Sequence, residues 1–442
     1  MKNRTTDNNC GQSLVELGYN SIDEFYDLSA IGNKDVRDLE KENPNFLIFP
    51  KVLGEYKDAI EKSYIFSLDK EKLTTYNLMG FIGRNNTQLT ITSRFAKDDK
   101  KDYFLHYMLQ KVFLINLFRF DQRTNREDYI WDFLMYLFPY FLKKAYLQGL
   151  YKAYIRQNYN DANIKGTIDI KTHIVKNIPF MGKIAYTTRE HSYDNNITQL
   201  IRHTIEHIKT HPYGDGILTI DSEVRDAISK FVFVTNNNYN KNDRQKVISA
   251  NLHPVVHPYY TEYSTLQKLC LCILQYDKLS FGQEKDQVYG LLFDGAWLWE
   301  EYLNTILNEC GFHHPCNNMS KNLFAIHLFS NTKSYIRYPD FWKTDFVLDA
   351  KYKNIDKTKI DRNDMHQLIS YMYILKASKG GLVHPCRMNS NEVQLVPVGE
   401  LSGYGGNVRL ISIPIPQKAE SFKNFITQMK EIEESLKKTI TL

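Results

Sequence analysis

The stretch YPDFWKTDFVLDAKYKN, residues 338–354, determines how the C-terminal part of this chain is expected to fold. Its apolar residues predict two short strands that are joined by a tight turn through WKTD. Asp349 and Lys351 are two residues apart, so they share one face of the second strand. The turn folds the chain back and brings Asp340 beside Asp349. A hairpin that only builds a core has no use for two neighbouring carboxylates, so the pattern indicates a functional site.

The chemistry of this hairpin follows from its charges. Two anions ~4 Å apart repel by about 1 kcal/mol in water and by roughly 4 kcal/mol at an effective dielectric of 20. A divalent cation removes the conflict, and paired carboxylates with open positions suit Mg²⁺. Lys351 beside the ion would orient a water and help to deprotonate it, or stabilise charge that develops on a phosphorus. The alternative is a surface hairpin on which Asp349 and Lys351 pair only with each other.

Two helices add polar residues to the predicted site. The segment HQLISYMY places Gln367 and Tyr371 four residues apart on one helical face, where they can position the lysine or a phosphate. The segment LWEEYL offers Glu300 and Glu301, of which one is expected to face inward. These residues extend the hairpin into a constellation that is typical of phosphodiester hydrolysis.

The hydrophobic periodicity changes along the chain and predicts an α+β protein of several domains. Short strands and turns indicate a small β-rich domain over residues 1–102, and apolar residues at three- and four-residue steps indicate a mainly helical region over 103–255. Residues 256–442 read as helices, the hairpin, a helix, a strand and a terminal amphipathic helix. This order predicts a C-terminal α/β domain with a mixed sheet flanked by helices.

Composition narrows the class of protein. The formal net charge of +5 permits nucleic-acid binding without requiring it. The N-terminus has no apolar stretch of the kind that follows the basic residues of a signal peptide, and the most apolar segment, residues 133–142, is too short to span a bilayer. Six cysteines without framework-like spacing fit a reducing compartment. We therefore expect a cytoplasmic protein that has no membrane contact.

Several blocks of sequence resemble one known family. Pro339-Asp340, Asp349-x-Lys351 and Gln367-xxx-Tyr371, with an upstream helical Glu, are similar to the PD-(D/E)xK nuclease superfamily. Within it, the chain resembles McrC and the related LlaJI-type nuclease subunits of modification-dependent restriction systems. The resemblance is carried by five blocks in order: GFIGRNNTQLTITSRF, IKGTIDIKTHI, YTTREHSYDNNITQLIRHTI, GLLFDGAWLWEEYL and YPDFWKTDFVLDAKYKN.

The resemblance implies roles for these residues. Asp340 and Asp349 would ligate Mg²⁺, for which Mn²⁺ is a possible substitute, and the Ala350 carbonyl would be a third ligand. Lys351 would polarise the attacking water. Glu300 is favoured over Glu301 as the helical acid.

The resemblance also implies partners. These are McrB-like AAA+ GTPase hexamers, which recognise the target, and double-stranded DNA that carries a modified base. The chain contains no G-x-x-x-x-G-K-[ST] motif, so it is not expected to bind a nucleotide itself. The β-rich N-terminal domain would contact the GTPase and stimulate it. Arg84, as an exposed cation on the turn GRNNT, is the candidate contact, and a solvated turn residue is the plain alternative.

Two other functions compete with this reading. The chain could be a non-catalytic assembly factor and GTPase activator, with a nuclease-like domain that only binds DNA. It could also be a RecB-like exonuclease that works alone, which the pair Gln367 and Tyr371 suggests. The intact acids and lysine favour the endonuclease subunit over the assembly factor.

Clusters of histidine and cysteine elsewhere are weaker signals. The segment CGFHHPC, residues 310–316, invites a zinc site but lacks the paired C-x₂-C spacing of zinc knuckles, so a loop is favoured. His203, His207 and His211 follow one helix face, and they span too great a length to share one metal. A partly exposed face that touches DNA is the preferred interpretation. The basic and tyrosine-rich segment KKAYLQGLYKAYIRQNY reads either as a DNA-contacting surface or as a solvated helix face.

Overall fold

The computed structural model divides the chain into two compact units. Unit 1 comprises Met1–Asn125 and Gly282–Leu442, and unit 2 comprises Arg126–Phe281. The residues that the structure describes are 3–43, 46–50, 64–85, 87–96, 102–113, 128–211, 214–280, 288–318, 321–323, 326–331, 335–388, 390–403 and 405–441. Among them, no helix is both long enough and apolar enough to cross a membrane.

The first sheet of unit 1 combines strands from distant parts of the sequence. Its order is β1-β7-β6-β11-β3, and β11 lies between β6, to which it is antiparallel, and β3, to which it is parallel. The strands are β1 (Arg4–Thr6), β3 (Phe46–Phe49), β6 (Leu78–Arg84), β7 (Thr87–Thr92) and β11 (Val288–Asp294). Val288 and Leu292 of β11 are buried in one core together with apolar residues of the N-terminal region. The N-terminal sheet therefore depends on a strand from the second half of the chain.

Short elements accompany this sheet. The helices α1 (Ile22–Ile31) and α2 (Val36–Glu42) contribute Leu28, Ile31 and Leu39 to the same core. A small sheet of order β2-β5-β4 is formed by β2 (Gln12–Ser13), β5 (Lys72–Thr75) and β4 (Phe66–Asp69). Ser21 caps α1 in a capping box with Glu24, which satisfies main-chain N–H groups at the helix start.

The second sheet of unit 1 is mixed and has the order β16-β17-β18-β20-β19. Strand β18 is parallel to β17 and to β20, whereas the two edge strands are antiparallel to their neighbours. The strands are β16 (Phe341–Lys343), β17 (Phe346–Ala350), β18 (Lys379–Cys386), β19 (Gln394–Glu400) and β20 (Asn407–Pro414). Short ladders precede it: β12 (Cys316–Asn318) with β13 (Lys321–Leu323), and β14 (Ile326–His327) with β15 (Ile336–Arg337).

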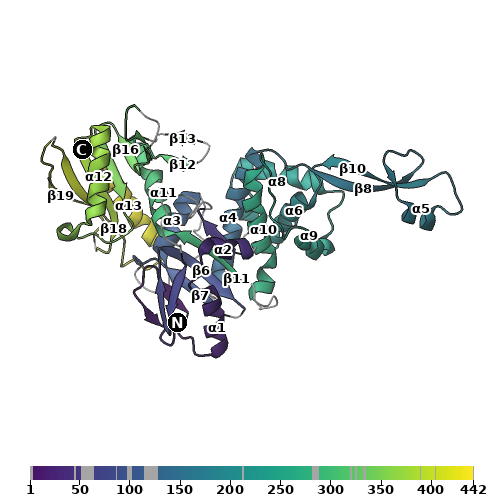
Figure 1. Cartoon of the computed structure of the whole chain (residues 1–442), viewed down its shortest axis with the longest axis horizontal. Helices are drawn as coiled ribbons and strands as arrows, with labels where there is room; N and C mark the ends of the chain where they lie inside the picture. Colours follow the sequence, from purple (N-terminus) through teal and green to yellow (C-terminus); the bar gives the residue numbers. More distant parts are fainter. Residues whose placement is uncertain are drawn as a thin grey trace. The chain divides into compact units, whose positions relative to one another are not determined.

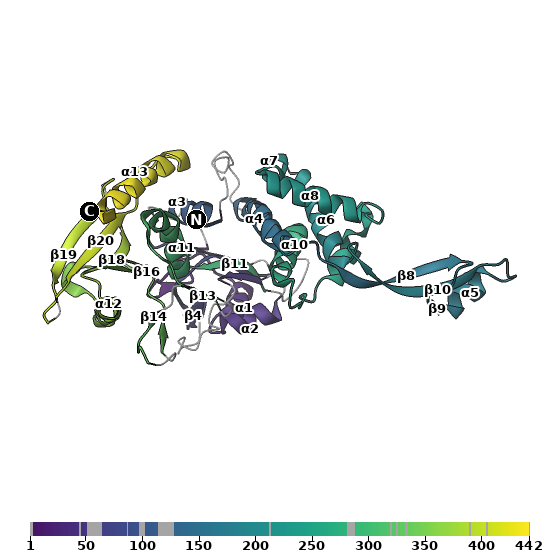
Figure 2. The same ribbon diagram turned by 90° about the horizontal axis from the view of Figure 1, so that it is seen from above.

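Helices cover both faces of the mixed sheet. Figure 2 shows α12 (Arg362–Leu375) on one face and α13 (Phe422–Thr441) on the other. Leu368, Tyr371 and Met372 of α12 share a core with Val347 of β17 and Leu382 of β18. On the other face, α13 contacts β20, α3 (Tyr103–Phe113) and α11 (Gly295–Leu307). Short 3₁₀ turns lie at η3 (Asn308–Cys310) and η4 (Lys357–Lys359). The predicted mixed sheet with flanking helices is confirmed.

Unit 2 is a helical bundle that carries a long β-ribbon. Its helices are α4 (Asp128–Leu147), α6 (Asn196–Lys209), α7 (Gly214–Leu218), α8 (Ser222–Thr235), α9 (Arg244–Ala250) and α10 (Thr261–Ser280), with a 3₁₀ turn η2 (Lys241–Asp243). Helix α10 packs against α4 and α6, and α8 packs against the same two helices. Strands β8 (Ala153–Asp161) and β10 (Ile184–Ser192) extend away from these helices and end in β9 (Thr167–Ile168) and α5 (Ile170–Lys176) (Figure 1). We call residues 153–192 the arm.

The observed units differ from the predicted domain limits at both boundaries. Helix α3, which begins at residue 103, belongs to unit 1, and helix α10, assigned to the C-terminal domain on sequence, packs inside unit 2. The predicted boundaries at 102/103 and 255/256 thus mark positions where the hydrophobic periodicity of the sequence changes. They do not coincide with the boundaries between the two units. The α+β class with more than one part is confirmed.

The arm was the least predictable element. The sequence predicts a mainly helical region here, but residues 153–161 form the strand β8 and residues 184–192 form the strand β10. The reason is that most residues of the arm are exposed or half-buried on both faces of the ribbon. Apolar and polar residues alternate along a strand only when one of its faces is buried. A ribbon that is exposed to solvent on both faces therefore lacks this alternation.

Strand β6 generates a test of the first sheet. Gly80 has φ +132°, and an added Cβ would lie 2.1 Å from the carbonyl oxygen of Leu291 in β11. We expect Gly80→Ala to lower the free energy of unfolding by roughly 3 kcal/mol, because both the backbone conformation and the strand contact would be strained. Gly216→Ala in α7 is the control, since open space surrounds Gly216. Equal stability of both variants in denaturant titrations would contradict the observed pairing.

Candidate active site

The hairpin of β16 and β17 sets the geometry of the site. Phe341 lies opposite Leu348 and Lys343 lies opposite Phe346, so the turn consists of Thr344 and Asp345. Asp345 adopts φ +64°, and its carboxylate accepts hydrogen bonds from the N–H and the hydroxyl of Ser378, at 2.5 Å and 2.6 Å. The turn is therefore tied to the residue that precedes β18, which fixes the register of the hairpin.

The two aspartates lie at the open end of this hairpin. Asp349 is fully buried, and its Oδ2 lies 2.7 Å from Nζ of Lys351. Its Oδ1 accepts no hydrogen bond from any residue that the structure describes. Asp340 is half-buried, and its Oδ2 accepts a hydrogen bond of 2.7 Å from the N–H of Ala350. The structure thus brings together Asp340, Asp349 and Lys351, as the sequence predicts.

The charges of these three residues depend on one another. Burial raises the pKa of Asp349, and the nearby charge of Asp340 raises it further, while Lys351 opposes both effects. Burial also raises the pKa of Asp340, again against Lys351. Burial alone would lower the pKa of Lys351, but the charges of Asp349 and Asp340 outweigh it, so this pKa is raised. Lys351 is therefore held as a cation between two carboxylates that destabilise each other.

Helix α12 supplies the groups that hold Lys351. Nζ of Lys351 donates to Oε1 of Gln367 at 3.2 Å, and Nε2 of Gln367 donates to the hydroxyl of Tyr371 at 3.2 Å. Gln367 and Tyr371, which were predicted to share one helical face, thus form a chain of two hydrogen bonds that ends at Lys351. Asp364, one turn earlier on α12, lies 3.9 Å from Nζ of Lys351 and 2.5 Å from Nζ of Lys353. Sequence reasoning missed Asp364, although the spacing 364, 367 and 371 marks one helix face.

The two glutamates of α11 have different neighbours. Burial raises the pKa of Glu300 well above its usual value, and the charges of Asp340 and Asp294 add to this effect. The charge of the hairpin therefore affects the protonation of Glu300. Glu301 instead lies 3.9 Å from Nε2 of His314. The choice of Glu300 over Glu301 as the helical acid stays a prediction.

His314 is a second residue that sequence reasoning did not place at the site. Its Nδ1 donates to the main-chain carbonyl of Asp340 at 2.6 Å, and its ring stacks on Phe341 with centroids 4.8 Å apart. These contacts hold the strand that carries Asp340. The histidines of the segment 310–316 carried a signal, but it suggested zinc and not a support for the hairpin.

A magnesium ion is compatible with the oxygen atoms at this hairpin. No group of three or more His, Cys, Asp or Glu side chains within the described ranges is arranged to hold a metal by itself. The hairpin offers another set, which is two carboxylates and a main-chain carbonyl. The N–H and C=O of a strand residue point to the same edge, so the carbonyl of Ala350 faces the same side as its N–H bond to Asp340. The buried, unpaired Oδ1 of Asp349 is the strongest indication, because such atoms normally have a partner.

Arg84 and His203 lie in surroundings that the sequence did not predict. Arg84 ends β6 with 7% of its surface exposed, and its guanidinium pairs with Asp27 at 3.4 Å and lies 5.1 Å from the ring centre of Tyr26. The prediction of an exposed cation is wrong because helix α1 covers this position. His203 is also buried, against the ring of Tyr239, so it is not part of an exposed face.

Within the described part of the chain, no group of histidine and cysteine side chains is arranged to hold zinc. His207 and His211 are half-buried. Nδ1 of His314 is engaged with the main chain, and the side chain of Cys316 lies outside the described residues.

The fold and the hairpin define an α+β protein with a carboxylate and lysine site at the edge of a mixed sheet. A family model described as "McrBC 5-methylcytosine restriction system component" matches residues 73–385. The match covers most of the chain, and the chain therefore belongs to this family. Among curated proteins, none matches the sequence.

Solved structures give a likeness of fold. One chain of the refined half-complex from the tetradecameric assembly of Thermococcus gammatolerans McrB AAA+ hexamers with bound McrC aligns with a TM-score of 0.53 and 13% identity, over 99% of this chain and 100% of that chain. A chain of the Thermococcus gammatolerans McrBC complex, determined by cryo-electron microscopy, aligns with a TM-score of 0.34 and 12% identity, over 70% and 87% of the two chains. At this identity, the first alignment supports the fold alone.

The unpaired oxygen of Asp349 generates a prediction about metal binding. We expect Mg²⁺ to raise the melting temperature of the wild-type chain, because an ion that binds only the folded state stabilises it by mass action. At a free concentration of about 100 times Kd, the gain is about 2.7 kcal/mol. Asp349→Asn should remove this response and should melt at least as high as the wild type in EDTA, since burial and the charge of Asp340 disfavour the ionised form of Asp349. A Mg²⁺ response that survives in Asp349→Asn would place the ion elsewhere.

Proposed function

We propose that this chain is the DNA-cleaving subunit of a McrBC-like, modification-dependent restriction complex, with a nuclease domain of the PD-(D/E)xK type. The observation that carries the proposal is the buried, unpaired oxygen of Asp349 beside Asp340 and Lys351. Membership of a restriction-system family supports it. The reaction would be the hydrolysis of phosphodiester bonds with Mg²⁺, for which Mn²⁺ would substitute.

Each residue of the site has a role in this proposal. Asp340, Asp349 and the carbonyl of Ala350 would hold the ion, which when bound would activate a water and neutralise charge on the phosphate. Lys351 would donate a hydrogen bond to the nucleophile or to a phosphate oxygen, because a raised pKa keeps it protonated.

The helical residues would support these groups. Gln367 and Tyr371 would limit the positions that the lysine can adopt, through the two hydrogen bonds that link them. Glu300 would be the helical acid of the site, where burial and the charges of Asp340 and Asp294 raise its pKa and so favour its protonated form.

The proposed partner is a McrB-like AAA+ GTPase hexamer. The solved structure with the higher TM-score comes from an assembly of McrB AAA+ hexamers with bound McrC. This chain has no phosphate-binding P-loop motif, so the hydrolysis of a nucleotide would belong to the partner. We propose that the partner also recognises the modified double-stranded DNA, and that this chain supplies the groups for cleavage.

The tip of the arm is the proposed contact with that partner. Apolar side chains gather there in exposed positions: Ile164, Ile168, Ile170, Ile174, Val175, Ile178, Phe180 and Met181. A concentration of this kind marks a surface that another protein covers. With Arg84 buried against α1, the arm replaces the turn after β6 as the favoured site of GTPase stimulation.

Cleavage should depend on Asp349 while assembly should not. We expect Asp349→Asn to reduce DNA cleavage by the assembled complex by at least about 100-fold, because a catalytic metal is worth several kcal/mol of charge stabilisation. Stimulation of the partner's GTPase should stay at the wild-type level.

The competing functions give different outcomes in the same assay. An unchanged cleavage rate together with an unchanged GTPase rate would favour a non-catalytic assembly factor. Cleavage of linear DNA by the wild-type chain alone, without the GTPase, would favour a stand-alone exonuclease.

The arm generates a test of assembly. Val175 and Met181 are 77% and 85% exposed, so replacing both with Ser should leave the melting temperature unchanged. We expect this variant to bind the partner at least about tenfold more weakly, which corresponds to 1.4 kcal/mol. Val256→Ser in the same unit is the matched control, since Val256 is 95% exposed but lies outside the arm. Equal binding by the two variants would exclude the arm as the contact.

A further inference from the structure

Tyr352 immediately follows the lysine of the proposed site and faces the other way. Lys351 is half-buried at the site, whereas Tyr352 is buried with 6% of its surface exposed. Its hydroxyl is 2.7 Å from Oγ of Ser93 and 3.2 Å from Sδ of Met79. Its ring meets Phe95 edge to face, with centroids 5.2 Å apart. The segment after β17 is thus fixed to Met79 of β6 and to Ser93 and Phe95, which follow β7.

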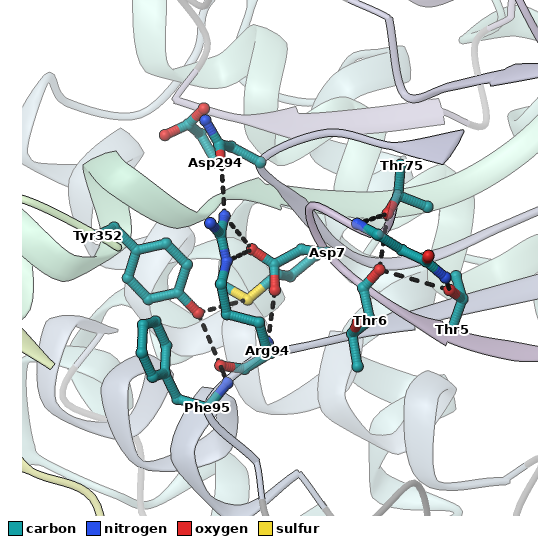
Figure 3. A network of polar contacts seen from close by, with 12 residues as sticks. Thr5, Thr6, Asp7, Thr75, Arg94, Phe95, Asp294 and Tyr352 are labelled. Atoms are coloured by element: carbon teal, nitrogen blue, oxygen red, sulfur yellow. Dashed lines mark hydrogen bonds and ion pairs between the residues drawn. The ribbon is translucent and has the colours of Figure 1, made fainter. Parts of the chain in front are cut away.

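Arg94 covers the ring of Tyr352 and is itself held firmly. Figure 3 shows the guanidinium between this ring and the carboxylate of Asp7. The guanidinium carbon is 5.0 Å from the ring centre, and Nε and Nη2 lie 2.8 Å and 2.6 Å from Oδ2 of Asp7. The main-chain N–H of Arg94 donates to Oδ1 of the same carboxylate, which is fully buried. A planar, multiply bonded guanidinium has little freedom to move.

The same arginine reaches the start of helix α11. Its Nη2 donates to the side-chain oxygen of Asn77, and the main-chain carbonyl of Asn77 accepts a hydrogen bond of 2.7 Å from the N–H of Gly295. Gly295 is the first residue of α11 and packs against Tyr352 so closely that an added Cβ would lie 2.7 Å from the ring. Asp294 caps the helix by accepting from the N–H of Trp297 at 2.8 Å.

These contacts join the two elements that carry the acids and the lysine. The segment after β17 bears Lys351, helix α11 bears Glu300, and both are anchored on Arg94 and Tyr352. The network uses charge-assisted hydrogen bonds from Arg94 to the buried carboxylate of Asp7, and such bonds are stronger than neutral ones. No residue of the network is needed for the chemistry proposed above, so its place beside the site calls for another role.

We propose that Arg94 and Tyr352 are positioning residues, which hold Lys351 and the Glu300 helix in the relative placement that Mg²⁺ binding and cleavage require. The inference rests on the proposed function. It also makes the N-terminal segment part of the cleavage site, because Asp7 is the buried counter-charge of Arg94. Residues that orient the groups around a metal in this way are worth about 10- to 100-fold in metal affinity or activity.

Three substitutions test the proposal. Tyr352→Leu removes the ring and keeps an apolar side chain, Arg94→Lys keeps the charge and loses the planar contacts, and Gly295→Ala presses a methyl group against the ring. We expect each to weaken the apparent Mg²⁺ affinity in thermal-shift titrations, and to slow cleavage by the assembled complex, by about 10- to 100-fold. Stimulation of the partner's GTPase should change by less than about twofold, which is within the usual effect of a distant substitution.

Coupling between the two sides of the contact gives an independent measurement. Gly295→Ala and Tyr352→Leu should be non-additive, since the leucine leaves room for the added methyl group. The double variant should therefore bind Mg²⁺ no more weakly than Tyr352→Leu alone. If the losses of Mg²⁺ affinity in the two single variants add up in the double variant, the contact between Gly295 and Tyr352 is not their cause.

A control separates positioning from simple stability. Tyr107→Phe removes a buried hydroxyl whose hydrogen bond to Glu433 is also 2.7 Å long, in the same unit and among residues that take no part in the site. We expect this variant to melt lower with an unchanged Mg²⁺ affinity. If Tyr352→Leu and Arg94→Lys behave like Tyr107→Phe, they are structural residues only and the inference fails. A wild-type chain that neither binds Mg²⁺ nor cuts DNA with its partner overturns the proposed function, and the inference with it.

Discussion

The site depends on the pairing of β16 with β17, which places two carboxylates and one ammonium group at the open end of a short hairpin. Burial makes the charged forms of both aspartates costly, and their mutual repulsion adds to that cost. Lys351 offsets part of it but leaves Oδ1 of Asp349 without a partner among the described residues. A hairpin of this kind is not optimised for its own stability. In the function proposed above, a bound cation would offset this cost, in the way that functional sites often retain local instability.

The rest of unit 1 restrains this hairpin from several directions. Asp345 ties the turn to Ser378, His314 holds the main chain of Asp340, and the network of Arg94 holds the segment after Lys351. Helix α12 orients the lysine from the opposite face through Gln367. A like-charged pair can persist only where the surrounding structure determines its geometry. These contacts come both from neighbouring elements, as for Lys351 and Gln367, and from the distant N-terminal region, as for Arg94 and Tyr352. The division of the chain into two units reflects the same dependence, because β11 and α11 return to the N-terminal sheet.

Many local features were predictable from sequence, and the reason is physical. Helices α12 and α13 each bury one face, so their apolar residues repeat with the period of a helix. The hairpin could be predicted because a tight turn forces its two strands together. The contact between Gln367 and Tyr371 could be predicted because residues four apart lie side by side on a helix. The secondary structure of the arm could not be predicted from the sequence, since neither face of its ribbon is buried against a core. Arg84 was misjudged because nothing in the turn sequence reveals that α1 and Asp27 cover it.

The sequence by itself determined the pairing of Asp340 with Asp349 and the faces shared by Asp349 with Lys351 and by Gln367 with Tyr371, because each of these relations spans fewer than about ten residues. The tertiary structure alone decided which distant groups support them: β11 within the first sheet, His314 on the main chain of Asp340, and Arg94 and Asp7 behind Tyr352. Hydrogen bonds and packing between residues far apart in the chain produce no periodic pattern in the amino-acid sequence. They depend on how complete elements pack, and only the folded chain specifies that.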